Sequence, residues 1–124
     1  MKPLLIMVGV LGAMAFGVFI ALGGAGFADY STMTGAEVYQ RLCASCHGSR
    51  GTAPTGAGNS YVRKRDYWTE ESLLAYIANP RAVKAKMPHL RASKRVMNPI
   101  PRTVPTAARE RLVAHVLQLM DALK

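Results

Sequence analysis

The chain has 124 residues, 16 Lys and Arg against 7 Asp and Glu, and a formal net charge of +9. Because a domain needs about 100 residues to enclose a core, this length excludes a second domain. The positive charge predicts an acidic partner, and nucleic acid is excluded because no basic stripe with interleaved aromatic residues is present and because the N-terminus carries an export signal.

The N-terminal export signal covers residues 1–28. The run 4–22 has no charged residue. Its length is close to the roughly 20 residues that span a bilayer and exceeds the ~7–15 of a signal-peptide core. The small residues Gly26 and Ala28, however, resemble a cleavage site. We therefore expect either a membrane tether through residues 4–22 or a signal peptide cleaved after Ala28. Both place residues 29–124 in the periplasm or another compartment outside the cytoplasm.

The first element of the exported part is a helix that begins near Gly35. Thr34 and Glu37 stand at the spacing of a capping box, in which each side chain accepts a hydrogen bond from the other's backbone N–H. The helix is expected to run into the sequence CASCH at 43–47, with Val38 facing inward. A loop follows it, because GSRGTAPTGAGNS is rich in Gly, Ser, Thr and Pro and lacks an apolar period.

The segment WTEESLLAYIANP predicts a second helix. Thr69 is a suitable N-cap, and Glu70 and Glu71 place negative charge at the positive end of the helix dipole. Asn79 and Pro80 are expected to end the helix. One face is apolar and carries Leu73, Leu74 and Ile77.

The segment 81–105 has almost no periodicity, and within it the prolines at 99, 101 and 105 predict an extended or turned chain over residues 97–105. A last helix begins near Thr106. No segment predicts a strand, so the expected fold class is all-α, with three to four short helices and long loops. We expect another group to fill the centre, because large apolar residues are few. Those of the last helix follow the 3/4 spacing: Leu112, Val113, Val116, Leu117, Met120 and Leu123.

The two cysteines of the chain occur in the sequence Cys43-Ala-Ser-Cys46-His47. Covalent haem attachment, half of a zinc site and a dithiol redox centre all use such a grouping. A dithiol centre requires the motif to start a helix after a strand, and zinc requires four ligands where only His89 and His115 remain. A disulfide would leave His47 without a role. Covalent haem accounts for both thiols, the histidine, the export signal and the missing core together.

These features resemble the class I cytochromes c, which are monohaem proteins with a CxxCH motif and a distal methionine. The resemblance extends over most of residues 34–124. It implies a cytochrome c-like fold in which the N- and C-terminal helices cross near Gly35 and enclose one covalent haem c. The residues that carry it are Gly35, Tyr39, CASCH at 43–47, Asn79-Pro80, Lys86-Met87-Pro88 and LVAHVLQL at 112–119.

The resemblance also implies the residues that hold the haem. Cys43 and Cys46 are expected to bind its vinyl groups as thioethers, and His47 is expected to be the proximal iron ligand. Met87 is expected as the sixth ligand, because a thioether opposite histidine raises the potential of the iron and closes the site to other ligands. Met97 is the competing candidate, since the segment between Met87 and the last helix is longer than the family usually needs.

Several further residues have expected places. Pro54 is expected to supply the backbone carbonyl that accepts a hydrogen bond from the second ring nitrogen of His47, the alternative being that it only stiffens the loop. His115 stands where the family has an aromatic residue that packs on the N-terminal helix, and its imidazole is expected to replace that ring. His89 is expected to be solvated. Two other methionines are expected in the core or the linker, Met33 and Met120.

The sequence predicts no catalytic residue, because it has no paired carboxylates in a shared motif, no nucleophile with a base and no phosphate loop. The first hypothesis is a free or tethered carrier of single electrons between periplasmic or membrane redox partners. The second is a fixed haem subunit of a membrane or periplasmic oxidoreductase complex. The third is an enzyme with an open distal site, which would bind carbon monoxide when reduced.

Two basic clusters are expected to steer the protein onto acidic surfaces of a dehydrogenase, a cytochrome bc-type complex or a terminal oxidase. The alternative is a generally basic surface that aids solubility. The first cluster is Lys84, Lys86, Arg91, Lys94 and Arg95, and the second is Arg63, Lys64 and Arg65.

Overall fold

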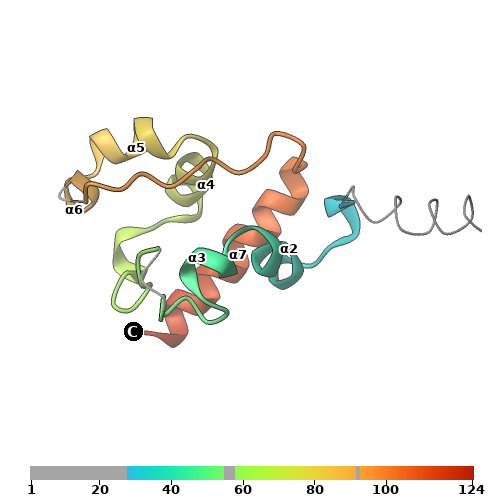
Figure 1. Ribbon diagram of the computed structural model, residues 1–124, viewed down its shortest axis with the longest axis horizontal. Helices are drawn as coiled ribbons and strands as arrows, with labels where there is room; N and C mark the ends of the chain where they lie inside the picture. The colour runs from blue at the N-terminus through green and yellow to red at the C-terminus, as the bar shows by residue number, and fades with distance from the viewer. Residues whose placement is uncertain (1–27, 55–57, 92) are drawn as a thin grey trace, which may run out of the picture.

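Helices form all the regular structure in the residues that the computed structural model describes, 28–54, 58–91 and 93–124, and no strand occurs among them (Figure 1). This agrees with the predicted all-α class. No helix of this part is long and apolar enough to cross a membrane. The expected signal or anchor lies, apart from Ala28, outside the described residues. The helices are η2 (Tyr30–Thr32), α2 (Gly35–Leu42), α3 (Ala44–His47), η3 (Arg65–Tyr67), α4 (Glu70–Ala78), α5 (Pro80–Lys86), α6 (Pro88–Arg91) and α7 (Thr106–Ala122).

Helix α2 begins, as predicted, at a capping box. The Thr34 hydroxyl accepts a hydrogen bond from the backbone N–H of Glu37 at 3.2 Å, and a Glu37 carboxylate oxygen accepts from the N–H of Thr34 at 2.7 Å. The bond from the Thr34 backbone lowers the pKa of the Glu37 carboxyl group. The helix ends at Leu42, and the backbone of Cys43 separates it from α3. The cysteine motif therefore forms a short helix of its own.

Helix α4 begins at the predicted cap, where the Thr69 hydroxyl accepts from the N–H of Ser72 at 3.1 Å. It ends just before Asn79, as expected, but the same residue then starts α5. The Asn79 side chain accepts from the N–H of Ala82 at 3.3 Å, and Pro80 takes the first helical position, where a missing N–H is not costly. Helices α5 and α6, both within the segment without periodicity, were not predicted.

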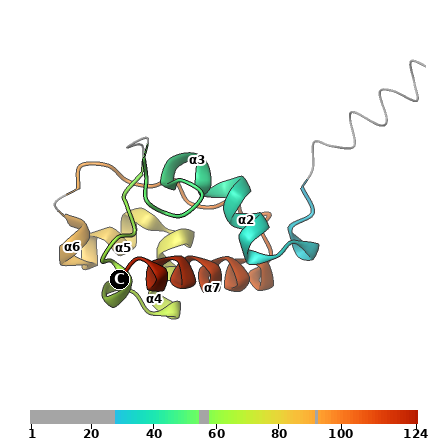
Figure 2. The same cartoon turned by 90° about the horizontal axis from the view of Figure 1, so that it is seen from below.

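Helices α2 and α7 pack on each other (Figure 2), and Gly35 lies in their contact. A Cβ atom at Gly35 would lie 2.1 Å from the backbone oxygen of Arg111 and 3.1 Å from the Cβ atom of His115, so the contact requires glycine. The Arg111 guanidinium adds a second tie, because it donates to the backbone oxygens of Tyr30, Ser31 and Met33 ahead of α2. The helix crossing that the resemblance implied is therefore present.

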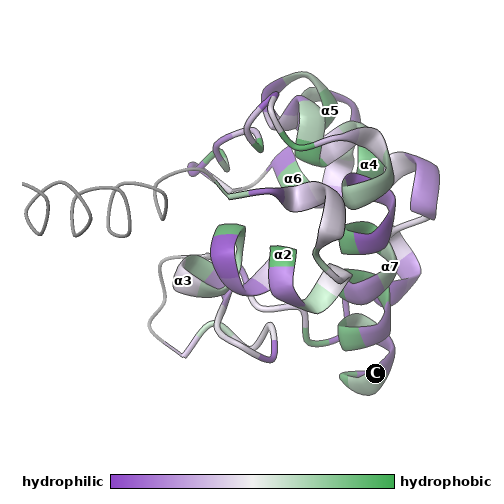
Figure 3. Ribbon diagram, turned by 90° about the vertical axis from the view of Figure 1, so that its right-hand side faces the viewer, coloured by the Kyte–Doolittle hydropathy of each residue, from purple (hydrophilic) through white to green (hydrophobic). Residues whose placement is uncertain are grey.

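The core lies where α2, α4, α7 and the proline-rich segment, residues 97–105, meet. Figure 3 shows apolar stretches alternating with polar ones along α7. The N–H of Ile100 donates to the Ile77 carbonyl at 3.0 Å, and Arg109 donates to the backbone oxygens of Pro101 and Val104, so the proline-rich segment is fixed to α4 and α7. The buried residues are Val38, Tyr39, Trp68, Leu73, Ile77, Ile100, Val104, Ala108, Leu112, Val113, Val116 and Met120.

Candidate functional site

The last four residues of the CASCH sequence form helix α3, with Cys43 at its N-cap, and Gly48 holds the helix in place. The N–H of Gly48 donates to the Ala44 carbonyl at 2.8 Å, and its own carbonyl accepts from the hydroxyl of Tyr39 at 2.7 Å. Gly48 has φ +79°, and a Cβ atom there would lie 2.8 Å from Cδ of Pro54. These contacts fix α3 to α2, and with it the three side chains of the motif.

Cys43 and Cys46 are both free thiols. Cys43 is half-buried and Cys46 is exposed. Burial, with a smaller contribution from Cys46, raises the pKa of the Cys43 thiol to about 11. A dithiol redox centre needs a thiol whose pKa is lowered. The raised pKa therefore argues against that alternative.

The side chains of the described residues are not arranged to bind zinc. Within residues 28–54, 58–91 and 93–124, no three His, Cys, Asp or Glu side chains are grouped so that they could hold a metal ion. Cys43, Cys46 and His47 are thus adjacent in sequence without forming a chelating cluster.

His47 is oriented by a hydrogen bond and by ring stacking. Its Nδ1 atom lies 2.8 Å from the backbone oxygen of Asn59, and its ring stacks on Tyr61 with centroids 4.9 Å apart. Pro54 was expected to supply this carbonyl, and the structure instead gives the bond to Asn59. A Cβ atom at Gly58 would lie 2.8 Å from Nδ1, so the returning loop passes directly against the ring. Within the described part of the chain, Nε2 has no hydrogen-bond partner and is left to bind a metal.

Tyr61 is a residue of the site that the sequence analysis missed. Besides stacking on His47, its ring packs edge-on against Tyr39, with centroids 6.4 Å apart. A Cβ atom at Gly51 would lie 2.1 Å from this ring, so glycine there makes room for it. Burial raises the pKa of the Tyr61 hydroxyl far above its usual range. The only sequence signal was a large aromatic residue following a loop of small polar ones.

Met87 and Met97, the two residues expected as candidates for the sixth ligand, lie in similar surroundings. Each is half-buried and packs against the core. Met87 lies at the end of α5, where its N–H donates to the Lys84 carbonyl at 3.3 Å, and its own carbonyl accepts from the N–H of Leu90 at 3.0 Å. Met120 is buried in the core, as expected.

The remaining histidines take part in ring contacts. His89 was expected to be solvated, but its ring stacks on Tyr67 with centroids 4.3 Å apart and meets the edge of Trp68 at 5.7 Å. Burial and the nearby charge of Lys64 lower its pKa. The His115 ring lies 5.3 Å from that of Tyr39, so it takes the aromatic position on α2 that was expected for it. Burial lowers its pKa as well.

Some residues of the predicted basic clusters are bound within the protein. Arg65 pairs with Asp121 at 3.2 Å and donates to the backbone oxygen of Trp68 at 2.8 Å. Lys84 and Arg91 donate to backbone oxygens of neighbouring segments. Arg65 is thus paired with a carboxylate, whereas Lys84 and Arg91 keep their charge, because backbone oxygens do not neutralise it.

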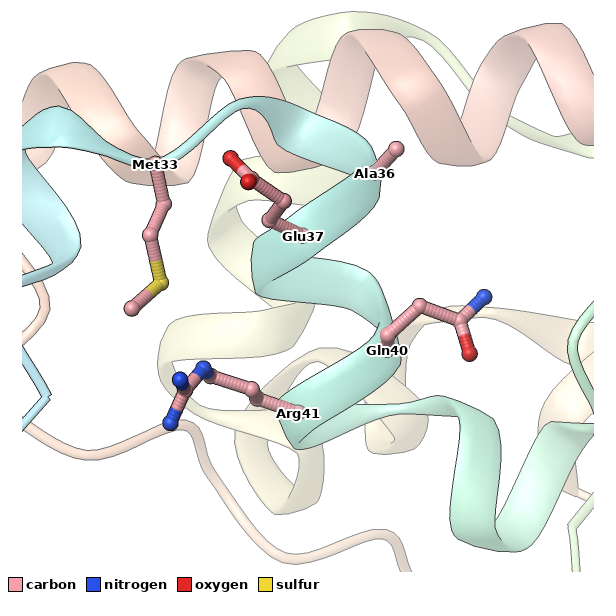
Figure 4. Close-up of a pocket in the computed structure, with 5 residues that line it drawn as sticks. All are labelled: Met33, Ala36, Glu37, Gln40 and Arg41. Atoms are coloured by element: carbon pink, nitrogen blue, oxygen red, sulfur yellow. The ribbon is translucent and has the colours of Figure 1, made fainter. Parts of the chain in front are cut away.

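A hollow of about 330 Å³ lies on the outer face of α2. Figure 4 shows its lining, with Met33 and Arg41 on one side of the helix and Gln40 on the other. The other two lining residues are Ala36 and Glu37. None of these side chains belongs to the cysteine motif or to the segment around Met87, so the hollow is separate from the candidate site.

The donor set fits covalent haem. Two free thiols stand at the CxxC spacing, the adjacent histidine is held through Nδ1 with Nε2 unengaged, and two thioethers border the core. An all-α fold with this motif at the junction of the N-terminal helices defines a c-type cytochrome.

A comparison with known families agrees with this class. Residues 31–116 match the model of the family described as cytochrome C oxidase, cbb3-type, subunit III, and the chain belongs to that family. The family implies covalently bound haem c and a role in electron transfer. No curated protein and no solved structure matches the chain.

Proposed function

We propose that residues 29–124 form a monohaem cytochrome c domain in which Cys43 and Cys46 anchor the haem and His47 binds its iron. The observation that carries this proposal is α3 with its N-cap, because Cys43 at the cap and Cys46 and the oriented His47 in the helix lie within five consecutive residues. Haem, when bound, supplies a one-electron couple at iron.

The surrounding residues support His47 as a ligand. The Asn59 carbonyl accepts the Nδ1 proton, which selects the tautomer with a free Nε2 and raises the basicity of the ring. Tyr61 stacks on the same ring and limits its rotation. These two contacts restrain the orientation of the imidazole, which supports its role as a ligand.

We propose that Met87 would hold the iron together with His47, with Met97 as the alternative. Met87 is supported by its place between α5 and α6, where hydrogen bonds on both sides hold its backbone. A thioether ligand raises the potential and occupies the position that a substrate would need. The domain would then transfer electrons without binding a substrate at iron.

We further propose that the chain works outside the cytoplasm and passes electrons between redox proteins with acidic surfaces. The formal net charge of +9 supports such partners. The main alternative is a fixed haem subunit of a membrane or periplasmic oxidoreductase complex. The match to a family described as an oxidase subunit supports the fixed-subunit alternative.

One preparation tests the proposal and separates the alternatives. Absorption spectra of the purified full chain, after extraction with acid and acetone, show whether haem stays covalently attached. The weak charge-transfer band of ferric haem with thioether ligation should be present. Loss of all haem on extraction would contradict the proposal, and carbon monoxide binding to the reduced protein would point to an open-site enzyme. An intact mass that includes residues 1–28, together with co-purifying subunits, would favour the fixed subunit over the carrier.

A further inference from the structure

Lys84 reaches across the segment around Met87, from the last turn of α5 to the chain beyond α6, which we call the methionine loop. It lies in α5, three residues before Met87, and its Nζ atom donates to the backbone oxygens of Ser93 and Arg95, the latter at 2.9 Å. These acceptors belong to the non-helical chain beyond α6. One ammonium group therefore joins the two ends of the loop that contains Met87.

Arg91 makes a second connection in the opposite direction. Its Nε atom, at the end of α6, donates to the Ala85 carbonyl in α5 at 3.1 Å. Together the two side chains brace the chain before Met87 against the chain after it. Both use backbone oxygens as acceptors, so the brace depends on the loop conformation and not on a partner side chain.

We propose that Lys84, assisted by Arg91, is a positioning residue that keeps the methionine loop closed, so that the thioether stays on the iron. This inference rests on the proposed haem ligation. Lys84 and Arg91 keep their positive charge, because their acceptors are neutral backbone oxygens, and they remain part of the basic cluster. Lys86 and Lys94 of the same cluster are exposed.

The physical argument is one of linked equilibria. An external ligand such as imidazole can bind the iron only in molecules whose methionine has left it, so its apparent affinity is proportional to the open fraction. Hydrogen bonds from a charged donor stabilise the closed loop. A tenfold rise in the open fraction corresponds to about 1.4 kcal/mol, which lies near the usual contribution of such a bond.

The test is a spectroscopic titration of the ferric holoprotein with imidazole. Lys84→Gln should bind imidazole about tenfold more tightly than the wild type, since each 1.4 kcal/mol is a factor of ten. Lys86→Gln is the matched control: it removes the same charge from the same helix, but Lys86 has no hydrogen bond or ion pair in the described part of the chain, and it should leave the affinity within about twofold. Lys84→Arg keeps a cationic donor and should stay close to the wild type.

Equal shifts in Lys84→Gln and Lys86→Gln would show a general charge effect and overturn the proposal, as would no shift in either. If Lys84→Gln does not fold, Arg91→Gln tests the same brace and should also tighten imidazole binding. Failure of the underlying ligation would look different, because the wild type itself would then lack the charge-transfer band of thioether-bound haem.

Discussion

Replacing Gly35 with alanine tests the helix crossing directly. The new Cβ atom would stand 2.1 Å from the Arg111 backbone oxygen, whereas ordinary contact begins at 3.4 Å, so α2 and α7 must separate locally by about 1.3 Å. Overpacking of this kind costs about 1–3 kcal/mol, against a gain of at most about 1 kcal/mol from the higher helix propensity of alanine. We expect the cost of the clash to exceed the gain in helix propensity, because the side chain of Arg111 also fixes the segment that enters α2 and so hinders a separation of the helices.

We therefore expect Gly35→Ala to lower the stability of the holoprotein by about 2 kcal/mol, which for a domain of this size lowers Tm by roughly 8–16 °C. This loss of stability can be measured by thermal unfolding, monitored by far-UV circular dichroism, and by urea unfolding. Ala36→Gly is the control, since it places glycine at the next position, which is exposed and outside the crossing. A Tm for Gly35→Ala equal to or above that of the wild type would refute the reasoning.

Three other predictions concern the site and the core. Met87→Ala should abolish the charge-transfer band and lower the reduction potential, both measured on the purified holoprotein; an unchanged spectrum would transfer the ligand assignment to Met97. Gly58→Ala would place a Cβ atom 2.8 Å from Nδ1 of His47, so the haem content per chain, measured as the pyridine haemochrome, should fall, and full content would show that the loop can move aside. Burial lowers the pKa of His115 below its ordinary 6.5, so the stability that its neutral form contributes is complete above that pH and is lost as the pH falls below it. His115→Phe should therefore unfold in urea with a flatter pH dependence below 6.5 than the wild type, and equal slopes would exclude this role.

The sequence predicted features that depend on neighbouring residues or on a local pattern. The capping box at Thr34 and the cap at Thr69 were recognisable, because each is specified by a few residues at fixed spacing, whereas the glycine at the crossing was implied by the resemblance to class I cytochromes c. The motif at Cys43–His47 likewise predicted covalent haem c, which the family match implies.

Features of the loops could not be predicted in this way. The acceptor for Nδ1 of His47 is a backbone oxygen, and every residue of a loop carries one, so residue type did not distinguish Asn59 from Pro54. The stacking of Tyr61 on His47 and of His89 on Tyr67 depends on how segments without periodicity return to the helices. The sequence analysis treated Lys84 as a surface charge. The backbone oxygens that accept its hydrogen bonds lie nine and eleven residues further along the chain, and no sequence signature marks them.

The ties made by Arg111 also determine how the domain is attached to the chain that precedes it. Because its guanidinium holds the backbone of Tyr30, Ser31 and Met33, the residues just before α2 are part of the rigid body and not a linker. A truncation or fusion that begins within residues 30–33 would therefore disturb the crossing of α2 and α7 itself, and not only the end of the chain.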